Sequence, residues 1–83
     1  MAEAKRILMV AIDKKVEALR MASGLTLLDD QVAIAVWGGL PEGAATAEQL
    51  EALDFADVPV EQVGRDVEAL ANRIINSDVV FFV

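Results

Sequence analysis

Ile7-Leu8-Met9-Val10-Ala11-Ile12 is the stretch that decides the fold, a continuous apolar run that ends at Asp13. An apolar run this short, without polar alternation, predicts a β-strand that is buried on both faces. Two further apolar runs predict a second and a fourth strand, and they read Gln31-Val32-Ala33-Ile34-Ala35-Val36-Trp37 and Val79-Val80-Phe81-Phe82-Val83. Strands of this kind are typical of parallel sheets whose two faces are covered by helices.

Two of the predicted helices lie on either side of the second strand in the sequence. The first is expected over 14–28, and Asp13 is placed to cap it because a carboxylate can accept from the free N–H groups of the first turn. Thr46 and Gln49 match a capping box, which predicts the start of a short second helix.

A weaker third strand is expected within 57–63. Pro59 has no N–H to donate to a sheet ladder, so this strand begins at or after Pro59 or lies at a sheet edge. A last helix is expected over 66–76, before the fourth strand. Its expected buried face consists of Val67, Leu70, Ala71 and Ile74.

The predicted elements follow one another in the order β-α-β-α-β-α-β. Strands that alternate with helices indicate parallel strands joined by right-handed crossovers. The 83 residues are expected to form a single domain over 1–83, since domains usually run to about 100–200 residues. The predicted fold class is therefore α/β, an open, mostly parallel sheet of about four strands with helices on both faces, as in flavodoxin-like three-layer sandwiches.

The first predicted helix is apolar over more than half of its circumference. One stripe consists of Ala18, Met21, Ala22, Leu25 and Leu28, and a second stripe, turned away from it, consists of Val16, Leu19 and Leu27. A small monomer rarely exposes a connected apolar surface, so we expect the second stripe to be a contact between subunits of a homo-oligomer. The last strand, with Phe81 and Phe82 on opposite faces, adds more apolar area than four strands can easily cover and favours the same expectation. The alternative is that helices and sheet cover both stripes within one chain.

The composition excludes several functional classes. The absence of Cys and His excludes disulfides, thiolate nucleophiles, Ser-His couples and imidazole metal ligands, and we expect no metal and no cofactor. A net charge of −7, with scattered basic residues, argues against nucleic-acid and anionic membrane partners. No apolar run approaches the ~20 residues of a membrane span, and no signal-peptide layout is seen, so the expected location is the cytoplasm.

Ligands of parallel sheets bind outside the carboxyl ends of the strands. The candidate ligand-binding residues at those ends are Asp13, Lys14, Trp37, Gly38, Gly39, Gly64 and Arg65. Lys14 and the two glycines after Trp37 could hold an anion, but no nucleotide-binding glycine motif is present. The plainer interpretation is a helix cap, solvated lysines and a tryptophan packed beneath the loop over 38–45.

Several segments also suggest a family. In order and spacing, Lys5–Val10, Val16–Leu25 and Val32–Gly38 resemble the first β-α-β unit of the DsrE/DsrF-like sulfur-relay proteins. The segment Val67–Phe82 resembles the closing helix and strand of that family, in which a helix rich in Ala and Leu leads into an aspartate and an apolar strand. The two ends together cover over half of the chain.

The resemblance implies a three-layer α/β sandwich, a cytoplasmic location and assembly into homo- or hetero-oligomers, often trimers or hexamers. Active members carry a persulfide on a cysteine in mid-chain, whereas this sequence has no cysteine and a short segment over 40–57. The implied function is a non-catalytic, oligomeric protein-binding or accessory subunit related to sulfur relay, with related family subunits as further partners. The alternative is a small-ligand or anion-binding domain that uses the crevice at the strand carboxyl ends.

Overall fold

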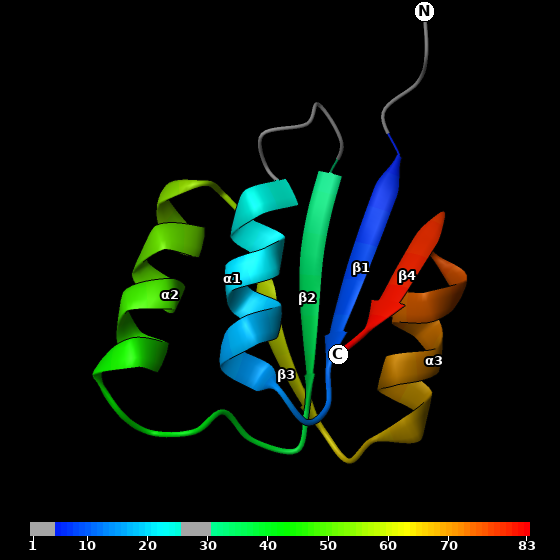
Figure 1. Cartoon of the computed structure of the whole chain (residues 1–83). Coiled ribbons are helices and arrows are strands. Elements are labelled where there is room, and N and C mark those ends of the chain that lie inside the picture. Colours follow the sequence, from blue (N-terminus) through cyan, green and yellow to red (C-terminus); the bar gives the residue numbers. More distant parts are fainter. Residues whose placement is uncertain (1–4, 26–30) are drawn as a thin grey trace, which may run out of the picture.

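The predicted alternation of strands and helices is confirmed in a computed structural model that describes residues 5–25 and 31–83. The elements are β1 (Arg6–Ala11), α1 (Lys15–Leu25), β2 (Gln31–Trp37), α2 (Ala44–Phe55), β3 (Val60–Gly64), α3 (Val67–Ile75) and β4 (Val79–Phe82). Figure 1 shows their arrangement. Leu27 and Leu28, predicted to lie in the two stripes of the first helix, are outside the described residues.

The four strands form one sheet in the order β3-β2-β1-β4, and every pair of neighbours is parallel. The predicted α/β class is thus confirmed. The strand order differs from the flavodoxin-like one, in which the first strand lies between the second and third. Here β1 lies between β2 and β4. The chain places β2 and then β3 on one side of β1, and it then crosses back to place β4 on the other side of β1.

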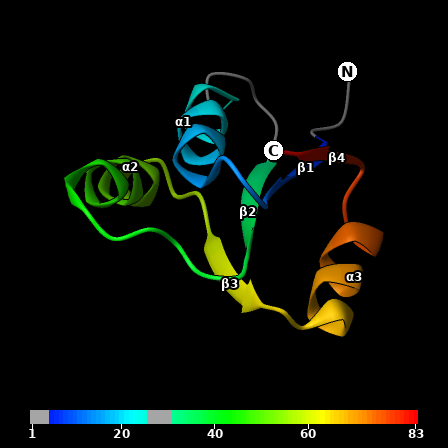
Figure 2. The same ribbon diagram turned by 60° about the horizontal axis from the view of Figure 1, so that its bottom comes forward.

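Helices cover both faces of the sheet, as predicted (Figure 2). On one face α1 packs on β1 and β2, and α2 packs beside α1. Ile7 and Met9 point into this layer, where Ile34, Leu53 and other apolar residues complete the larger core. On the opposite face α3 packs on β2, and Leu8 and Val10 belong to a smaller core there.

The second apolar stripe of α1 does not face away from the sheet. Leu19 is fully buried in the larger core, and Val16 is half-buried. Met21, assigned by its spacing to the core-facing stripe, is instead half exposed, although Ala18 and Ala22 are buried. Leu19 is buried in place of Met21 because a helix that is apolar on two sides can present either side to the sheet. The position of the sheet decides which side is buried.

Two helix starts also differ from the prediction. The residue directly before α1 is Lys14, whose carbonyl accepts from the N–H of Ala18 (2.9 Å), so Asp13 lies one residue too early to be the cap. Helix α2 begins two residues before Thr46, after Gly43, which has φ 132° and no capping side chain. Thr46 is therefore a buried residue inside the helix and not the first member of a capping box.

The last predicted helix is confirmed in its bounds, but its buried face is turned. Asp66 caps α3 by accepting a hydrogen bond from the N–H of Ala69 at 3.2 Å. Leu70 and Ile74 pack on the sheet, as expected. The other two predicted members, Val67 and Ala71, are exposed. Helix α3 therefore keeps an apolar stripe on its outer side, formed by Val67, Ala71 and Ile75 at intervals of four residues.

Candidate functional site

The predicted site at the carboxyl ends of the strands is only partly assembled. Asp13, Lys14 and Gly39 line one open hollow of about 560 Å³, together with Lys15, Val16, Glu17, Leu40 and Pro41. The hollow lies between the start of α1 and the loop that follows β2. Two lysines and two carboxylates border it, so their charges largely offset one another.

Lys15, the second of the two lysines that follow Asp13, organises this end of the sheet. Its ammonium Nζ donates to the carbonyl of Gly39 at 2.6 Å and thereby ties α1 to the loop after β2. A Cβ added to Gly38 would lie 3.1 Å from the same Nζ, and Gly38 has φ 80°, a conformation that favours glycine. The N–H of Gly38 donates to the carbonyl of Gly64 at 2.7 Å, which links the ends of β2 and β3.

Trp37 and Arg65 do not join this hollow. Trp37 is half-buried on the opposite face of the sheet, where it packs against the smaller core that contains Ala35 and Val63. Arg65 is exposed between β3 and α3. The seven predicted residues thus separate into a lysine-lined hollow, a glycine contact between two loops and two residues outside both.

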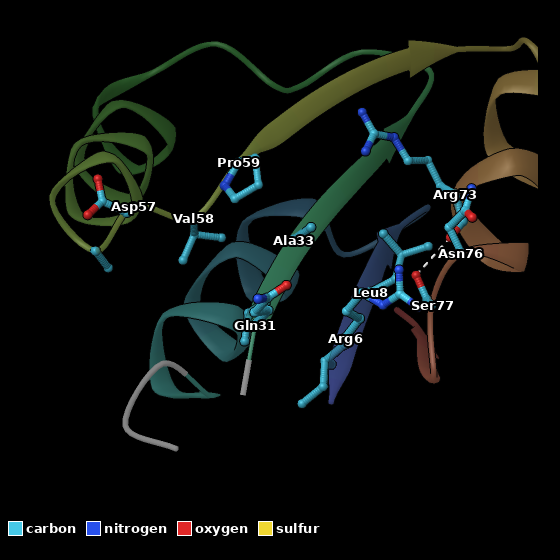
Figure 3. Close-up of a pocket in the computed structure, with 13 residues that line it drawn as sticks. Arg6, Leu8, Gln31, Ala33, Asp57, Val58, Pro59, Arg73, Asn76 and Ser77 are labelled. Atoms are coloured by element: carbon cyan, nitrogen blue, oxygen red, sulfur yellow. Dashed lines mark hydrogen bonds between the residues drawn. The ribbon is translucent and has the colours of Figure 1, made fainter. Parts of the chain in front are cut away.

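A second hollow, which the sequence did not predict, lies at the amino ends of the strands (Figure 3). Its volume is about 470 Å³, within the range of ~300–1,000 Å³ that small-molecule sites occupy. Leu8 and Ala33 of the sheet line it, with Val58 and Pro59 on one side and the end of α3 on the other. We call this hollow the amino-end groove.

The amino-end groove follows from the late start of β3. The N–H of Ile34 donates to the carbonyl of Pro59 at 2.9 Å, and the ladder between β2 and β3 begins there. Pro59 has no N–H to return a bond, and Asp57, which precedes it closely, takes a left-handed φ of 57°. The chain therefore diverges from β2 before Pro59. Since α3 is the one described helix on this face, the diverging segment leaves a space between itself and α3.

Two arginines line the amino-end groove, and each has an acidic partner. The Arg6 backbone N–H donates to Asp78 Oδ2 at 2.9 Å, and the Arg6 side chain lies 3.9 Å from the same oxygen. Arg73 on α3 forms an ion pair with Glu61 on β3. All four side chains are about half exposed, so these pairs stabilise the fold only weakly. The groove accordingly offers hydrogen-bond donors and acceptors around an apolar floor, without a strong net charge.

The most exposed apolar element of the sheet is β4. Its register with β1 places Val80 and Phe82 on the α3 face and Phe81 on the α1 face, because opposed residues of neighbouring strands point the same way. Phe81 is 41% exposed and Phe82 is 60% exposed. Val79 and Val80 are half-buried at the margins of the two cores, whereas the Phe81–Phe82 end of the strand is exposed. A sequence run of Val and Phe predicted a strand but could not show that the strand lies at an edge.

Searches for other kinds of site, confined to 5–25 and 31–83, give no metal centre and no membrane span. No group of three or more acidic side chains lies together as a metal ion would require. None of the described helices has the length and apolar character needed to cross a bilayer. Comparison of the chain with protein-family models, with curated proteins and with solved structures finds no match.

Proposed function

We propose that this chain is a non-catalytic, protein-binding accessory domain of the DsrE/DsrF-like kind, which works as an oligomer in the cytoplasm. The observation that carries the proposal is the exposed end of the apolar strand β4, where Phe81 and Phe82 lie on opposite faces of the sheet. Exposed apolar patches on small domains mark protein-interaction sites far more often than isolated apolar side chains do.

The outer stripe of α3 adds to this surface. Val67 and Ile75 are largely exposed, with Ala71 between them on the same side of the helix. A domain of this size has a thin core, so association would bury apolar area that the single chain leaves in water. The proposed partners are further copies of this chain, as trimers or hexamers by resemblance, and related family subunits.

The chemistry that the resemblance would bring is not available to this chain. A persulfide needs a cysteine sulfur, and the sequence contains no cysteine. We therefore propose a structural or partner-binding role beside a subunit that carries the sulfur. This proposal predicts that the domain associates with other chains and turns over no sulfur substrate by itself.

The test is the mass of the protein in solution. Light scattering coupled to size exclusion, at protein concentrations from about 10 µM to 1 mM, is expected to show a mass above the 8.9 kDa of one chain and rising with concentration. A constant mass of one chain over that range, together with no binding to subunits from a sulfur-relay operon, would refute the proposal.

A second candidate function is the binding of a small molecule, and the amino-end groove favours it more than the predicted crevice does. Its floor is apolar and its rim carries Gln31, Arg73 and Asn76, a composition typical of ligand pockets. Trp37 lies at the other end of the sheet, so its fluorescence is a poor probe of this groove. A screen by backbone amide NMR in which no compound shifts Ala33 or Asn76 would argue against this function.

A further inference from the structure

Among the residues that the structure describes, β4 has one neighbouring strand, β1, and its other edge presents hydrogen-bonding groups to a further strand. In a parallel ladder alternate residues bond to alternate neighbours. The N–H of Val83 donates to the carbonyl of Val10 (3.0 Å), and the carbonyl of Val83 accepts from Ile12 (2.8 Å), so this residue faces β1. By the same alternation Phe81 faces β1, and the N–H and C=O groups of Val80 and Phe82 point outward from the sheet.

The two edges of the sheet differ in how they discourage pairing. At the β3 edge the strand is preceded by Pro59 and carries Glu61 and Gln62. A proline and a charged side chain at an edge disfavour pairing with a strand of another chain. At the β4 edge the strand reads Val79-Val80-Phe81-Phe82, without a charge, a proline or a bulge. An apolar edge of this kind is a template for another strand.

We infer that β4 pairs with β4 of a second copy of this chain, antiparallel and about a two-fold axis through Phe81. In that register Val80 lies opposite Phe82 of the copy, and each such pair exchanges two N–H···O=C bonds. All four outward groups of each strand then find a partner. Because the strand carries no charge, no like charges are opposed across the pair.

A second copy fits this edge better than an unrelated strand because the side chains of β4 complement those of another β4. The two-fold axis places Phe81 directly opposite its copy on the α1 face, where aromatic pairs stabilise a sheet, and brings Phe82 against Val80 of the copy on the α3 face. Neither helix is centred on β4, since α1 packs mainly on β1 and β2 and α3 packs mainly on β2 (Figure 2). The result is a continuous eight-stranded sheet.

The inference rests on the proposed function and specifies one contact of the oligomer. A four-residue strand buries less than the ~1,200 Å² of a standard interface, so the pair is expected to be weak and in rapid exchange. A two-fold contact closes after two copies. It is compatible with a dimer or with a hexamer that has two-fold axes, and a trimer without larger forms would overturn it.

The first test compares two Phe-to-Lys variants by sedimentation equilibrium. Phe82→Lys introduces a charge at the open edge and is expected to raise the dissociation constant of the dimer roughly tenfold or more. Phe55→Lys is the matched control, since Phe55 is exposed at the end of α2, and both variants change the net charge from −7 to −6. Phe55→Lys is expected to associate like the wild type.

The second test keeps the inference falsifiable if Phe82→Lys does not fold. The protein has no cysteine, so Phe81→Cys introduces a single thiol at the proposed two-fold axis. Opposed residues at that position have Cα atoms about 4.5 Å apart, within the range that a disulfide spans. Under a mild oxidant Phe81→Cys is expected to form a disulfide-linked dimer at least tenfold faster than Phe55→Cys.

The outcomes separate the two proposals. An oligomer whose mass is unchanged by Phe82→Lys, or equal cross-linking rates for Phe81→Cys and Phe55→Cys, would overturn the β4 contact and leave the proposed oligomeric function standing. A wild-type protein that remains a single chain at all concentrations would overturn both. Loss of the dimer in Phe82→Lys alone, with rapid cross-linking of Phe81→Cys, would establish the contact.

Discussion

Replacement of Leu19 by alanine distinguishes a core residue from a subunit contact. The sequence pattern assigned Leu19 to a stripe between subunits, whereas the structure places it in the core shared by α1, α2 and the sheet, with 0% of its surface exposed. The two placements predict different results. A core residue stabilises the single chain, and a contact residue stabilises the assembly.

The expected loss of stability for Leu19→Ala is about 3 kcal/mol. Three carbon atoms leave the core, at ~0.8 kcal/mol each, and the cavity that remains adds to this transfer term. Small domains have total stabilities of about 5–15 kcal/mol, so the variant is expected to fold with a much reduced margin. The melting temperature is expected to fall by roughly 12–24 °C, since 1 kcal/mol corresponds to about 4–8 °C at this size.

The assay is urea unfolding followed by the fluorescence of Trp37. As the one tryptophan of the chain, Trp37 packs against the smaller core on the opposite face of the sheet, so it reports unfolding of the domain beyond the site of substitution. Met21→Ala is the matched control because Met21 lies in the same helix and is 50% exposed. Its expected cost is below about 0.5 kcal/mol.

Two results would refute this reasoning. Equal urea midpoints for Leu19→Ala and Met21→Ala would mean that Leu19 is no better packed than an exposed residue. Wild-type stability of Leu19→Ala combined with a smaller mass in solution would mean that Leu19 lies between subunits after all. Either result would contradict the packing of α1 on the sheet.

Two further substitutions test local features of the fold. Asp66→Ala removes the carboxylate that accepts from the N–H of Ala69 at the start of α3, and it is expected to lower the free energy of unfolding in urea by about 1 kcal/mol. Asp66→Asn keeps an acceptor and should cost only a few tenths of a kcal/mol. Equal losses for the two variants would show that the cap is unimportant. Gly38→Ala places a Cβ beside Lys15 on a residue whose backbone has φ 80°, and it is expected to lower the free energy of unfolding by about 1–3 kcal/mol. Gly39→Ala has open space around the new Cβ and should be tolerated. The reverse order of urea midpoints would contradict the loop geometry.

Much of the fold could be predicted because the signals are local. Runs such as Ile7–Ile12 are short and apolar enough to favour a buried strand, and alternation with helical periods implies parallel crossovers. Pro59 correctly predicted where β3 begins. Local signals failed at Thr46, where a capping-box pattern lies inside a helix that begins earlier, at Ala44.

The predicted site was less complete because it depends on which way side chains point. Asp13, Lys14 and Gly39 come together since they follow neighbouring strands. Trp37 turns away from them because it lies two residues after Ala35, and alternate residues of a strand share a face. That parity is visible in the sequence and could have excluded Trp37. The amino-end groove depends on the path of the chain before β3, for which no local pattern exists.

Which of the excess apolar residues are exposed also depends on the fold, because the strand order decides which surfaces the helices cover. The sequence contains more apolar surface than a small core needs, and its pattern attributed the excess both to Leu19 and its neighbours on α1 and to Phe81 and Phe82 of the last strand. Strand order separates these two surfaces, because α1 is placed over two central strands, where Leu19 is buried, and β4 is placed at an edge. The crossover through α3 leads from β3 past β2 and β1, so the last strand receives a neighbour on one side only. Phe81 and Phe82 are therefore exposed for a topological reason that composition and periodicity do not contain.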